Sequence, residues 1–473
     1  MKNKLFFSPI IIILFFTTAI YSQSHFTGFW KGQINIANKN ISFQIKISYK
    51  GKYQGKLSIP EQNAFDLQMA KLKIDSNKIS FDILSSPQTA SFSSDLVSKD
   101  SIQGTFSQLG MKGTFFLKRA KPDVNETALD SLENNFISKE VVFYNGKIKF
   151  AGTLTLPDTI GKFPAVVLLT GSGQQNRDEN IFGFKIFKII AAHLTEDGYA
   201  VLRFDDRGIG GSTTGETTAT TAEYADDGLS AIQFLKTQKN IIKDKIGLLG
   251  HSEGGLASVI AGSASEDVAF IILMAGPSVS GGDLILYQLK TILKAQNISE
   301  KIIAKKLRLE KELIAAIKRG EDLQKYKTDL YKSALDDIKL LPPEKRNKIK
   351  NDSAYAENQA TAQLQALNNP WLKFFITFNP TSAIEELNCP VLILFGGKDM
   401  QVPIELNKKP FELAFKNGGD NDYKIIVFPN ANHLFQKAGS GMPDEYKTLD
   451  KKFVSGFIPA IVKWLNLNVK GRK

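Results

Sequence analysis

A serine between two glycines, in Gly250-His251-Ser252-Glu253-Gly254, has the G-x-S-x-G pattern of a nucleophile on a tight turn. The apolar run IGLLG precedes the motif and the helix-like stretch GLASVIAG follows it, so the serine stands between a strand and a helix. Glycine is needed in this context because a side chain at Gly250 or Gly254 would collide with the neighbouring strand or helix. The motif predicts that Ser252 attacks an acyl carbon; the alternative is an ordinary serine in a glycine-rich loop.

A serine hydroxyl needs a base, usually histidine, and the histidine needs a carboxylate that fixes its tautomer. Of the four histidines in the chain, only His433 follows Ser252, and it lies just after the apolar strand pattern YKIIVF. Asp399 is the best candidate for the carboxylate, because its loop, GGKDMQVP, directly follows a buried-strand pattern. Asp422 is the second candidate, but it precedes a strand and so falls at the opposite edge of a sheet. The spacing therefore predicts a triad of Ser252, Asp399 and His433.

Such a triad also needs backbone N–H groups that hold the negatively charged oxygen of the tetrahedral intermediate. The residue after the nucleophile, Glu253, is expected to supply one of them. The second should come from the loop after the strand pattern VVLLT, where we favour Ser172 and place Gly173 next. A plain glycine turn is the alternative for this loop.

From Glu140 onward the chain has short, nearly continuous apolar runs, and the candidate site residues follow the ends of these runs. The runs are FPAVVLL, YAVLRF, KIGLLG, AFIILM and CPVLILF, with helix-like stretches between several of them. Such runs are typical of strands buried on both faces of a parallel sheet, and strand–helix alternation predicts a doubly wound α/β domain. We expect this domain to span residues 139–473, with the candidate site residues at the carboxyl ends of its strands.

One insertion interrupts the alternation. Residues 283 to about 372 have no strand pattern, and Leu309, Leu313 and Ile317 recur at four-residue spacing among lysines and glutamates. This pattern predicts amphipathic helices that form a cap over the strand ends.

The N-terminus has the pattern of a targeting segment. Lys2 and Lys4 precede an apolar stretch that ends at Phe16, and mostly small or polar residues follow. This predicts a secretory signal peptide over residues 1–22, cleaved near residues 19–23, and hence a periplasmic or secreted protein without a stable membrane span. An uncleaved N-terminal anchor is the alternative.

Between this segment and the α/β domain, residues 23–120 alternate apolar and polar side chains and predict a small all-β barrel or sandwich. Residues 121–138 are polar and predict a linker. The β module has no cluster of titratable residues, so we expect a structural or binding role, with carbohydrate or another surface as its partner.

The net charge of +12 is unevenly distributed. Residues 290–350 hold 17 basic and 9 acidic residues, so 8 of the 12 net charges lie in the helical insertion. No nucleic-acid-binding motif accompanies them, and a solvated helical face is the simpler interpretation, with attraction to acidic surfaces as the alternative. Two further charged clusters, residues 177–179 and 205–207, predict an ion-pair network between neighbouring loops, with substrate binding as the alternative.

The chain has one cysteine, Cys389, which cannot form an internal disulfide and fits a buried strand. Histidine and cysteine spacing suggests no metal site, and no dinucleotide fingerprint opens a helix after the first strand. We therefore expect neither a metal nor a cofactor.

Six stretches in order along the chain resemble the successive motifs of exported α/β-hydrolases of the serine aminopeptidase-like and acyl-esterase group. They are GSGQQNRDEN, RFDDRGIGGST, GLLGHSEGG, LMAGPSV, GGKDMQVP and NANHLFQ, within about residues 139–470. The resemblance implies Ser252 as nucleophile, Asp399 as acid and His433 as base. It also implies hydrolysis of carboxylic esters, often with short acyl chains. The chain departs from the group at Gln174, where relatives commonly have proline.

Three functions are compatible with these residues. The first is a serine esterase that acts on a small-molecule ester through an acyl-enzyme. The second is a serine peptidase of the aminopeptidase type, which would need a group that holds the substrate amine; the sequence does not point to one. The third is a binding protein with a relic hydrolase domain. Binding alone does not require the three triad residue types in this order, so their presence argues against it. We expect the esterase.

Overall fold

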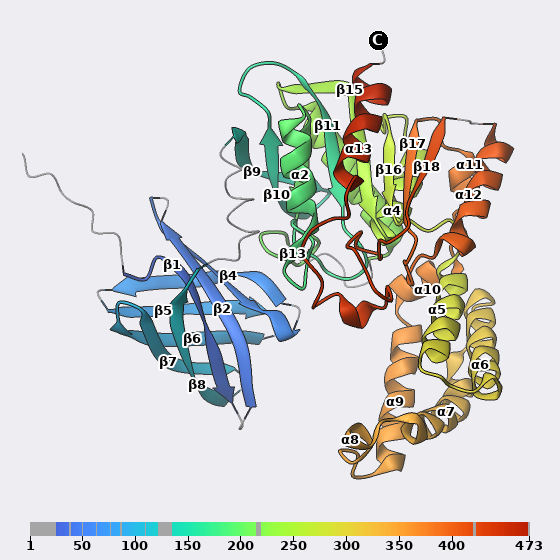
Figure 1. Cartoon of the computed structure of the whole chain (residues 1–473), viewed down its shortest axis with the longest axis horizontal. Helices are drawn as coiled ribbons and strands as arrows, with labels where there is room; N and C mark the ends of the chain where they lie inside the picture. The colour runs from blue at the N-terminus through green and yellow to red at the C-terminus, as the bar shows by residue number, and fades with distance from the viewer. Residues whose placement is uncertain are drawn as a thin grey trace, which may run out of the picture. The chain divides into compact units, whose positions relative to one another are not determined.

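The computed structural model describes residues 25–36, 39–49, 51–62, 64–75, 77–85, 88–108, 110–121, 135–213, 219–419 and 422–471. The predicted signal peptide and most of the predicted linker lie outside these residues. The chain divides into two compact units, Met1–Lys121 and Pro122–Lys473. In Figure 1 the strands of the first unit are blue to teal, and the second unit runs from teal and green to red.

Eight antiparallel strands of the first unit close into a barrel, because β1 pairs with both β2 and β8. The strands are β1 (Gly28–Ile36), β2 (Lys39–Tyr49), β3 (Tyr53–Ile59), β4 (Ala64–Asp75), β5 (Lys78–Ser85), β6 (Gln88–Ser98), β7 (Ser101–Gln108) and β8 (Met111–Ala120), with a short 3-10 helix η1 (Pro60–Gln62). The small all-β domain predicted from the alternating pattern is confirmed, and of the two forms considered it is the barrel.

Aromatic side chains fill the interior of this barrel. The ring centroid of Phe92 lies 4.8 Å from that of Phe81 and 5.6 Å from that of Phe115. Trp30 is fully buried, and its indole N–H donates to the carbonyl oxygen of Phe26 at 2.9 Å. Because an eight-stranded barrel is just wide enough for side chains to fill, this interior is a packed hydrophobic core.

An eight-stranded sheet forms the centre of the second unit, in the order β18-β17-β16-β15-β11-β14-β10-β9. From β14 to β18 all neighbours are parallel, while β10 is antiparallel to β14 and β9. The strands are β9 (Ile137–Asn145), β10 (Ile148–Leu156), β11 (Phe163–Leu169), β14 (Ala200–Phe204), β15 (Ile241–His251), β16 (Ile271–Met274), β17 (Val391–Gly396) and β18 (Tyr423–Phe428); β12 (Asn180–Ile181) and β13 (Phe184–Lys185) form a separate hairpin.

Helices cover both faces of the sheet. Along β11, Val166 and Leu168 pack into the core that contains α2 (Ile186–Glu196) and α13 (Phe457–Leu465). Val167 and Leu169 pack into the opposite core. That core contains α3 (Thr221–Lys236), α4 (Glu253–Ala264), α11 (Thr381–Glu385) and α12 (Ile404–Gly418). Since both faces are buried, alternate residues cannot be polar, which explains the continuous apolar runs and confirms the doubly wound α/β fold.

The helical insertion lies between β16 and β17 and forms its own group of helices in Figure 1. It comprises α5 (Gly281–Ala295), α6 (Glu300–Lys318), η3 (Leu323–Tyr326), α7 (Lys327–Leu340), α8 (Pro343–Arg346), α9 (Asp352–Leu367) and α10 (Pro370–Thr377). Leu313 and Ile317 are buried on α6, and Leu364 of α9 belongs to the same small core. The helices run five residues beyond the predicted end at residue 372, because the aromatic helix α10 belongs to the insertion.

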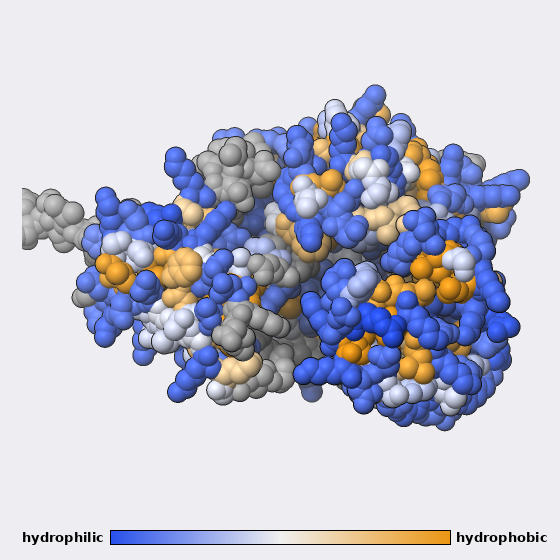
Figure 2. Space-filling model, turned by 60° about the horizontal axis from the view of Figure 1, so that its bottom comes forward, coloured by the Kyte–Doolittle hydropathy of each residue, from blue (hydrophilic) through white to orange (hydrophobic). Residues whose placement is uncertain are grey.

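Many lysines of this insertion are paired across helices, as with Lys305 of α6 and Asp336 of α7, whose Nζ and Oδ2 lie 2.7 Å apart. Figure 2 shows hydrophilic residues over most of the face in view, with apolar residues in separate small patches. In the described part of the chain, none of the helices combines the length and the apolar character that crossing a membrane requires.

Candidate active site

Ser252 lies on a sharp turn between β15 and α4. Its φ of 54° and ψ of −117° are strained for a residue with a side chain, and its backbone N–H donates to the carbonyl oxygen of Met274 at 2.9 Å. A Cβ atom on Gly250 would lie 2.0 Å from the carbonyl oxygen of Gly254, and one on Gly254 would lie 2.1 Å from that of Leu169. The two glycines of the motif are therefore required by close backbone contacts.

His433 and Asp399 form a buried pair. His433 Nδ1 lies 2.8 Å from Asp399 Oδ2, and the two side chains are 4% and 0% exposed. The other carboxylate oxygen of Asp399 accepts hydrogen bonds from the backbone N–H groups of Gln401 (2.8 Å) and Val402 (2.9 Å). Both oxygens are thus held, and the carboxylate can orient the imidazole and fix its tautomer.

Ser252 and the His433–Asp399 pair lie at the same edge of the sheet. Ser252, Asp399 and His433 follow the carboxyl ends of β15, β17 and β18, which run parallel. The imidazole centroid of His433 lies 4.8 Å from that of His251, the residue before Ser252. Asp422 lies at the other edge, where its carbonyl oxygen accepts from the N–H of Val391 at the start of β17.

A second buried histidine–carboxylate pair lies behind the turn. His251 Nδ1 lies 2.7 Å from Glu179 Oε1, and its Nε2 lies 3.1 Å from the carbonyl oxygen of His433. Because a carboxylate and a carbonyl both accept, the protonated imidazolium satisfies both contacts. Burial is the largest influence and by itself would lower the pKa of His251, but the Glu179 carboxylate, the carbonyl oxygen of His433 and the charge of Asp399 together outweigh it, and the pKa is raised.

This pair connects two loops of the site. Glu179 Oε1 also accepts the backbone N–H of Gly171 at 2.8 Å, so it ties the loop after β11 to His251 and, through His251, to the loop that carries His433. The sequence pattern had placed Glu179 only in an ion-pair cluster. Its partner is 72 residues away, and no spacing rule links the two.

Replacing Glu179 with leucine should lower the free energy of unfolding by about 3–5 kcal/mol, because it leaves a buried charge without its partner. It would also leave the Gly171 N–H without an acceptor. The exposed pair of His193 and Glu196, whose Nδ1 and Oε2 lie 3.8 Å apart, offers a matched control. Glu196→Leu should change the free energy of unfolding by about 0.5 kcal/mol or less in the same urea titration. Equal effects of the two substitutions would contradict a structural role for the buried pair.

The loss of stability caused by Glu179→Leu should also depend on pH. A histidine whose pKa is raised by folding adds stability that is complete below its usual value of 6.5 and fades as pH rises through the raised value. The gap in stability between the wild type and Glu179→Leu should therefore be largest at acidic pH and shrink at alkaline pH, as urea titrations at several pH values can measure.

The predicted oxyanion residues lie around Ser252. Glu253 is the first residue of α4, so its N–H has no acceptor within the helix. In the loop after β11, the N–H of Gly171 is already donated to Glu179, and Gly173 has a φ of 89°. Ser172 and Gly173 thus remain the two candidates for the second donor. The side chain of Gln174, the next residue of this loop, donates through Nε2 to the carbonyl oxygen of Arg207 at 2.9 Å.

The side chain of Glu253 connects the turn to the helical insertion. Its Oε1 accepts from the Thr221 hydroxyl and from the Trp371 indole N–H, each at 2.6 Å. The residue is 2% exposed, and burial raises the pKa of its carboxyl group. Trp371 belongs to α10, 118 residues after Glu253, and sequence spacing did not indicate it.

The charged clusters form the expected ion-pair network. Arg177 bonds both carboxylate oxygens of Asp205, at 3.0 and 2.7 Å, and Arg207 bonds both oxygens of Asp227 at 2.7 Å each. Arg203 pairs with Asp178. Among the residues that the structure describes, no three or more His, Cys, Asp or Glu side chains are grouped so that they could hold a metal ion.

Comparison with known proteins identifies related sequences. One is esterase EstD of Thermotoga maritima, 27% identical over 371 residues, which are 76% of this chain and 75% of that protein. Another is an uncharacterized 31.7 kDa protein of Escherichia coli, 25% identical over 266 residues, or 55% of this chain and 81% of that one.

Solved structures of low sequence identity also match. An esterase of Pyrococcus furiosus is 16% identical, with a TM-score of 0.43 over 74% of this chain and 96% of that chain. Est1E of Butyrivibrio proteoclasticus with bound ferulic acid is 17% identical, with a TM-score of 0.40 over 70% of this chain and all of that one.

The family model described as serine aminopeptidase, S33, matches residues 184–437, which are more than half of the chain. The matched segment contains β14 to β18, the helical insertion and the loops of Ser252, Asp399 and His433. The resemblance seen in the six sequence motifs is thereby confirmed, and the chain belongs to the serine aminopeptidase S33 family of α/β-hydrolases.

Proposed function

We propose that this protein is a serine esterase that hydrolyses small carboxylic esters with short acyl chains, and that Ser252, His433 and Asp399 are its catalytic triad. The observation that carries the proposal is the buried His433–Asp399 pair, on the sheet edge where Ser252 stands on its strained turn. The esterase name of the Thermotoga relative supports the choice of ester over other substrates.

In the acylation step, Ser252 Oγ attacks the acyl carbon while His433 Nε2 takes the hydroxyl proton. Asp399 keeps the Nδ1 proton of His433 in place and stabilises the imidazolium that forms. The negative charge moves onto the former carbonyl oxygen, which the N–H of Glu253 and a second N–H from Ser172 or Gly173 would hold. When the intermediate collapses, His433 returns the proton to the departing alkoxide.

Deacylation repeats these steps with water. His433 takes a proton from the water molecule, whose oxygen attacks the acyl-enzyme, and the proton then returns to Ser252 Oγ as the carboxylic acid leaves. The reaction consumes one ester and one water and needs no cofactor.

A peptidase acting on free amino termini is the second candidate, because the family carries that name and Glu253 is a carboxyl group next to the nucleophile. Such a peptidase would need a charged carboxylate for the substrate ammonium. Burial raises the pKa of Glu253, which favours the neutral acid, and its Oε1 already accepts two hydrogen bonds. These features favour the ester substrate.

We further propose that the protein works outside the cytoplasm. The support is the signal-peptide pattern of residues 1–22, in which lysines precede a short apolar stretch and a polar end.

The test is hydrolysis of p-nitrophenyl acetate, butyrate and octanoate by the chain without residues 1–22, beside aminoacyl p-nitroanilides. We expect turnover of the esters, no comparable cleavage of the anilides, and a fluorophosphonate label on Ser252 found by peptide mass spectrometry. Faster cleavage of the anilides would favour the peptidase. The absence of both turnover and labelling would contradict the triad.

A further inference from the structure

One helix of the insertion reaches the turn of the proposed nucleophile. This helix is α10, which lies in Figure 1 at the end of the insertion nearest to the sheet. Its Trp371 donates the indole N–H to Glu253 Oε1 at 2.6 Å. Glu253 directly follows Ser252 and begins α4, and its backbone N–H is the first of the two proposed oxyanion donors. The insertion therefore contacts the residue that would hold the negative charge of the tetrahedral intermediate.

The carboxyl group of Glu253 is held from two sides. The hydroxyl of Thr221, the first residue of α3, donates to the same oxygen as Trp371 and also at 2.6 Å. Glu253 is 2% exposed and Thr221 is fully buried, so water does not compete for these hydrogen bonds. Two donors from different helices fix the direction of the side chain. Because an N–H group at the start of a helix has no acceptor within the helix, this side-chain anchor restrains the residue that carries it.

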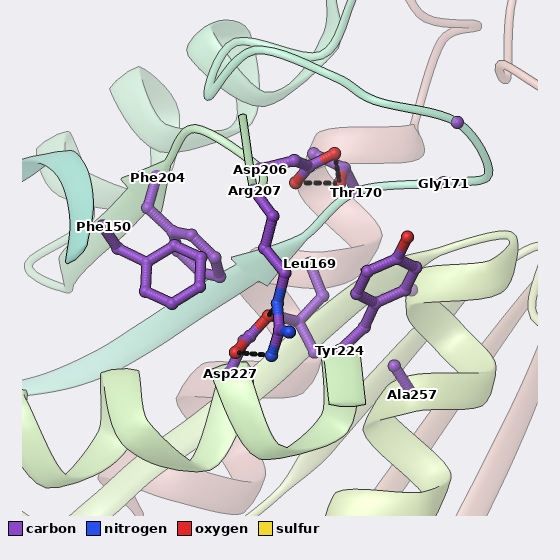
Figure 3. Close-up of a pocket in the computed structure, with 12 residues that line it drawn as sticks. Phe150, Leu169, Thr170, Gly171, Phe204, Asp206, Arg207, Tyr224, Asp227 and Ala257 are labelled. Carbon is purple, nitrogen blue, oxygen red and sulfur yellow. Dashed lines mark hydrogen bonds and ion pairs between the residues drawn. The ribbon is translucent and has the colours of Figure 1, made fainter. Parts of the chain in front are cut away.

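The charged side chains near α3 have partners other than Glu253. Figure 3 shows Arg207 reaching Asp227 of α3, with Nε 2.7 Å from Oδ2. It also shows Asp206 beside Thr170, whose hydroxyl donates to Oδ1 at 2.8 Å. Glu253 instead takes its hydrogen bonds from neutral donors. Burial raises the pKa of Glu253 and so favours the uncharged acid, which adds no negative charge beside the oxyanion.

Trp371 is itself fixed within the insertion. The side-chain oxygen of Asn369, at the start of α10, accepts the backbone N–H of Trp371 at 2.8 Å. The Trp371 ring stacks on that of Phe375, with centroids 5.7 Å apart and an angle of 6° between the planes. Phe375 packs against α5, where a Cβ atom on Gly281 would lie 2.2 Å from its ring. A stacked ring pair anchored in the insertion thus presents the indole N–H to Glu253.

We propose that Trp371 positions the oxyanion N–H of Glu253 by holding its side chain, so that the helical insertion takes part in stabilising the transition state. The inference rests on the proposed esterase function and adds Trp371 and Thr221 to it as positioning residues. They act through Glu253 and not on the substrate. Their loss should therefore weaken binding of the transition state more than binding of the substrate, and lower kcat while KM stays nearly constant.

Removing the indole N–H while keeping an aromatic ring tests the proposal. Trp371→Phe should lower kcat for p-nitrophenyl acetate about tenfold and leave KM within about twofold of the wild type. Glu253→Leu removes the acceptor of both hydrogen bonds and should lower kcat about a hundredfold. Glu253→Gln should keep kcat within about threefold of the wild type, because the amide oxygen can accept the same two hydrogen bonds.

An inhibitor that forms an oxyanion gives a second measurement. When a trifluoromethyl ketone binds, Ser252 Oγ bonds to its carbonyl carbon, the hydroxyl proton passes to His433, and the carbonyl oxygen becomes negatively charged. The Ki of this inhibitor should rise by the same factors by which kcat/KM falls. Trp464→Phe is the matched control, since Trp464 packs in the core on the other face of the sheet from α4. It should leave kcat, KM and Ki unchanged.

The outcomes separate the inference from the function. Folded Trp371→Phe and Glu253→Leu variants with the wild-type kcat and Ki would overturn the positioning role and leave the esterase in place. An effect of Trp371→Phe on KM alone would also overturn it, because the indole would then be a substrate contact. If Glu253→Leu fails to fold, as judged by thermal melting, Trp371→Phe and Glu253→Gln decide. A wild type that neither hydrolyses p-nitrophenyl esters nor takes a fluorophosphonate label at Ser252 would instead overturn the proposed function.

Discussion

Ser252→Ala should lower kcat for p-nitrophenyl butyrate by about a millionfold, because the proposed nucleophile is removed and no acyl-enzyme can form. The fold should persist, since alanine has the same Cβ atom and the two glycines that make the turn possible remain. Circular dichroism melting should therefore match the wild type, and the fluorophosphonate label should be lost.

Ser263→Ala is the matched control for this substitution. Ser263 lies in the same helix, α4, and its hydroxyl donates only a local hydrogen bond to the carbonyl oxygen of Ile260 at 3.0 Å. This variant should keep both turnover and labelling. Turnover by Ser252→Ala within tenfold of the wild type would show that another residue carries the reaction.

Asp399→Asn should lower kcat by about 10⁴-fold with little change in KM. The reason lies in the hydrogen bonds of this carboxylate. Its Oδ1 accepts from two backbone N–H groups, those of Gln401 and Val402. The carbonyl oxygen of an asparagine must take that place, so its NH₂ group faces His433 Nδ1. A donor at this position selects the tautomer with the proton on Nε2, which cannot accept the proton of Ser252.

Asp422→Asn is the control for this second substitution, because Asp422 lies at the opposite edge of the sheet, beside Val391. It should leave kcat unchanged in the same assay. Equal losses from the two substitutions, or a kcat for Asp399→Asn within tenfold of the wild type, would remove Asp399 from the proposed mechanism.

The local parts of the site could be predicted from the sequence because each depends on a short stretch. The glycines at 250 and 254 indicate the turn, the apolar runs before Ser252, Asp399 and His433 place all three at strand ends, and parallel strands bring their carboxyl ends to one edge. The same rule distinguished Asp422 from Asp399 as the candidate acid. Asp422 precedes a strand, so it falls at the opposite edge of the sheet.

The contacts that hold the site together could not be predicted. The Glu179–His251 pair joins residues that are 72 positions apart in the sequence. The hydrogen bond between Glu253 of α4 and Trp371 of α10 joins residues that are 118 positions apart. Neither follows from a periodicity or a motif, because each depends on how a loop or an inserted helix folds back onto the sheet edge.

By itself, the sequence determined the elements and their order: a β-rich module, a doubly wound α/β domain with a helical insertion, and three candidate catalytic residues at strand ends. Hydrophobic periodicity and glycine turns are local properties, and the sequence displays them directly. Only the tertiary structure decided that β1 pairs with β8 to close the module into a barrel, and that His251 pairs with Glu179 behind the turn of Ser252. Each of these depends on which distant segments pack together, and that outcome is set by the burial of whole surfaces rather than by spacing along the chain.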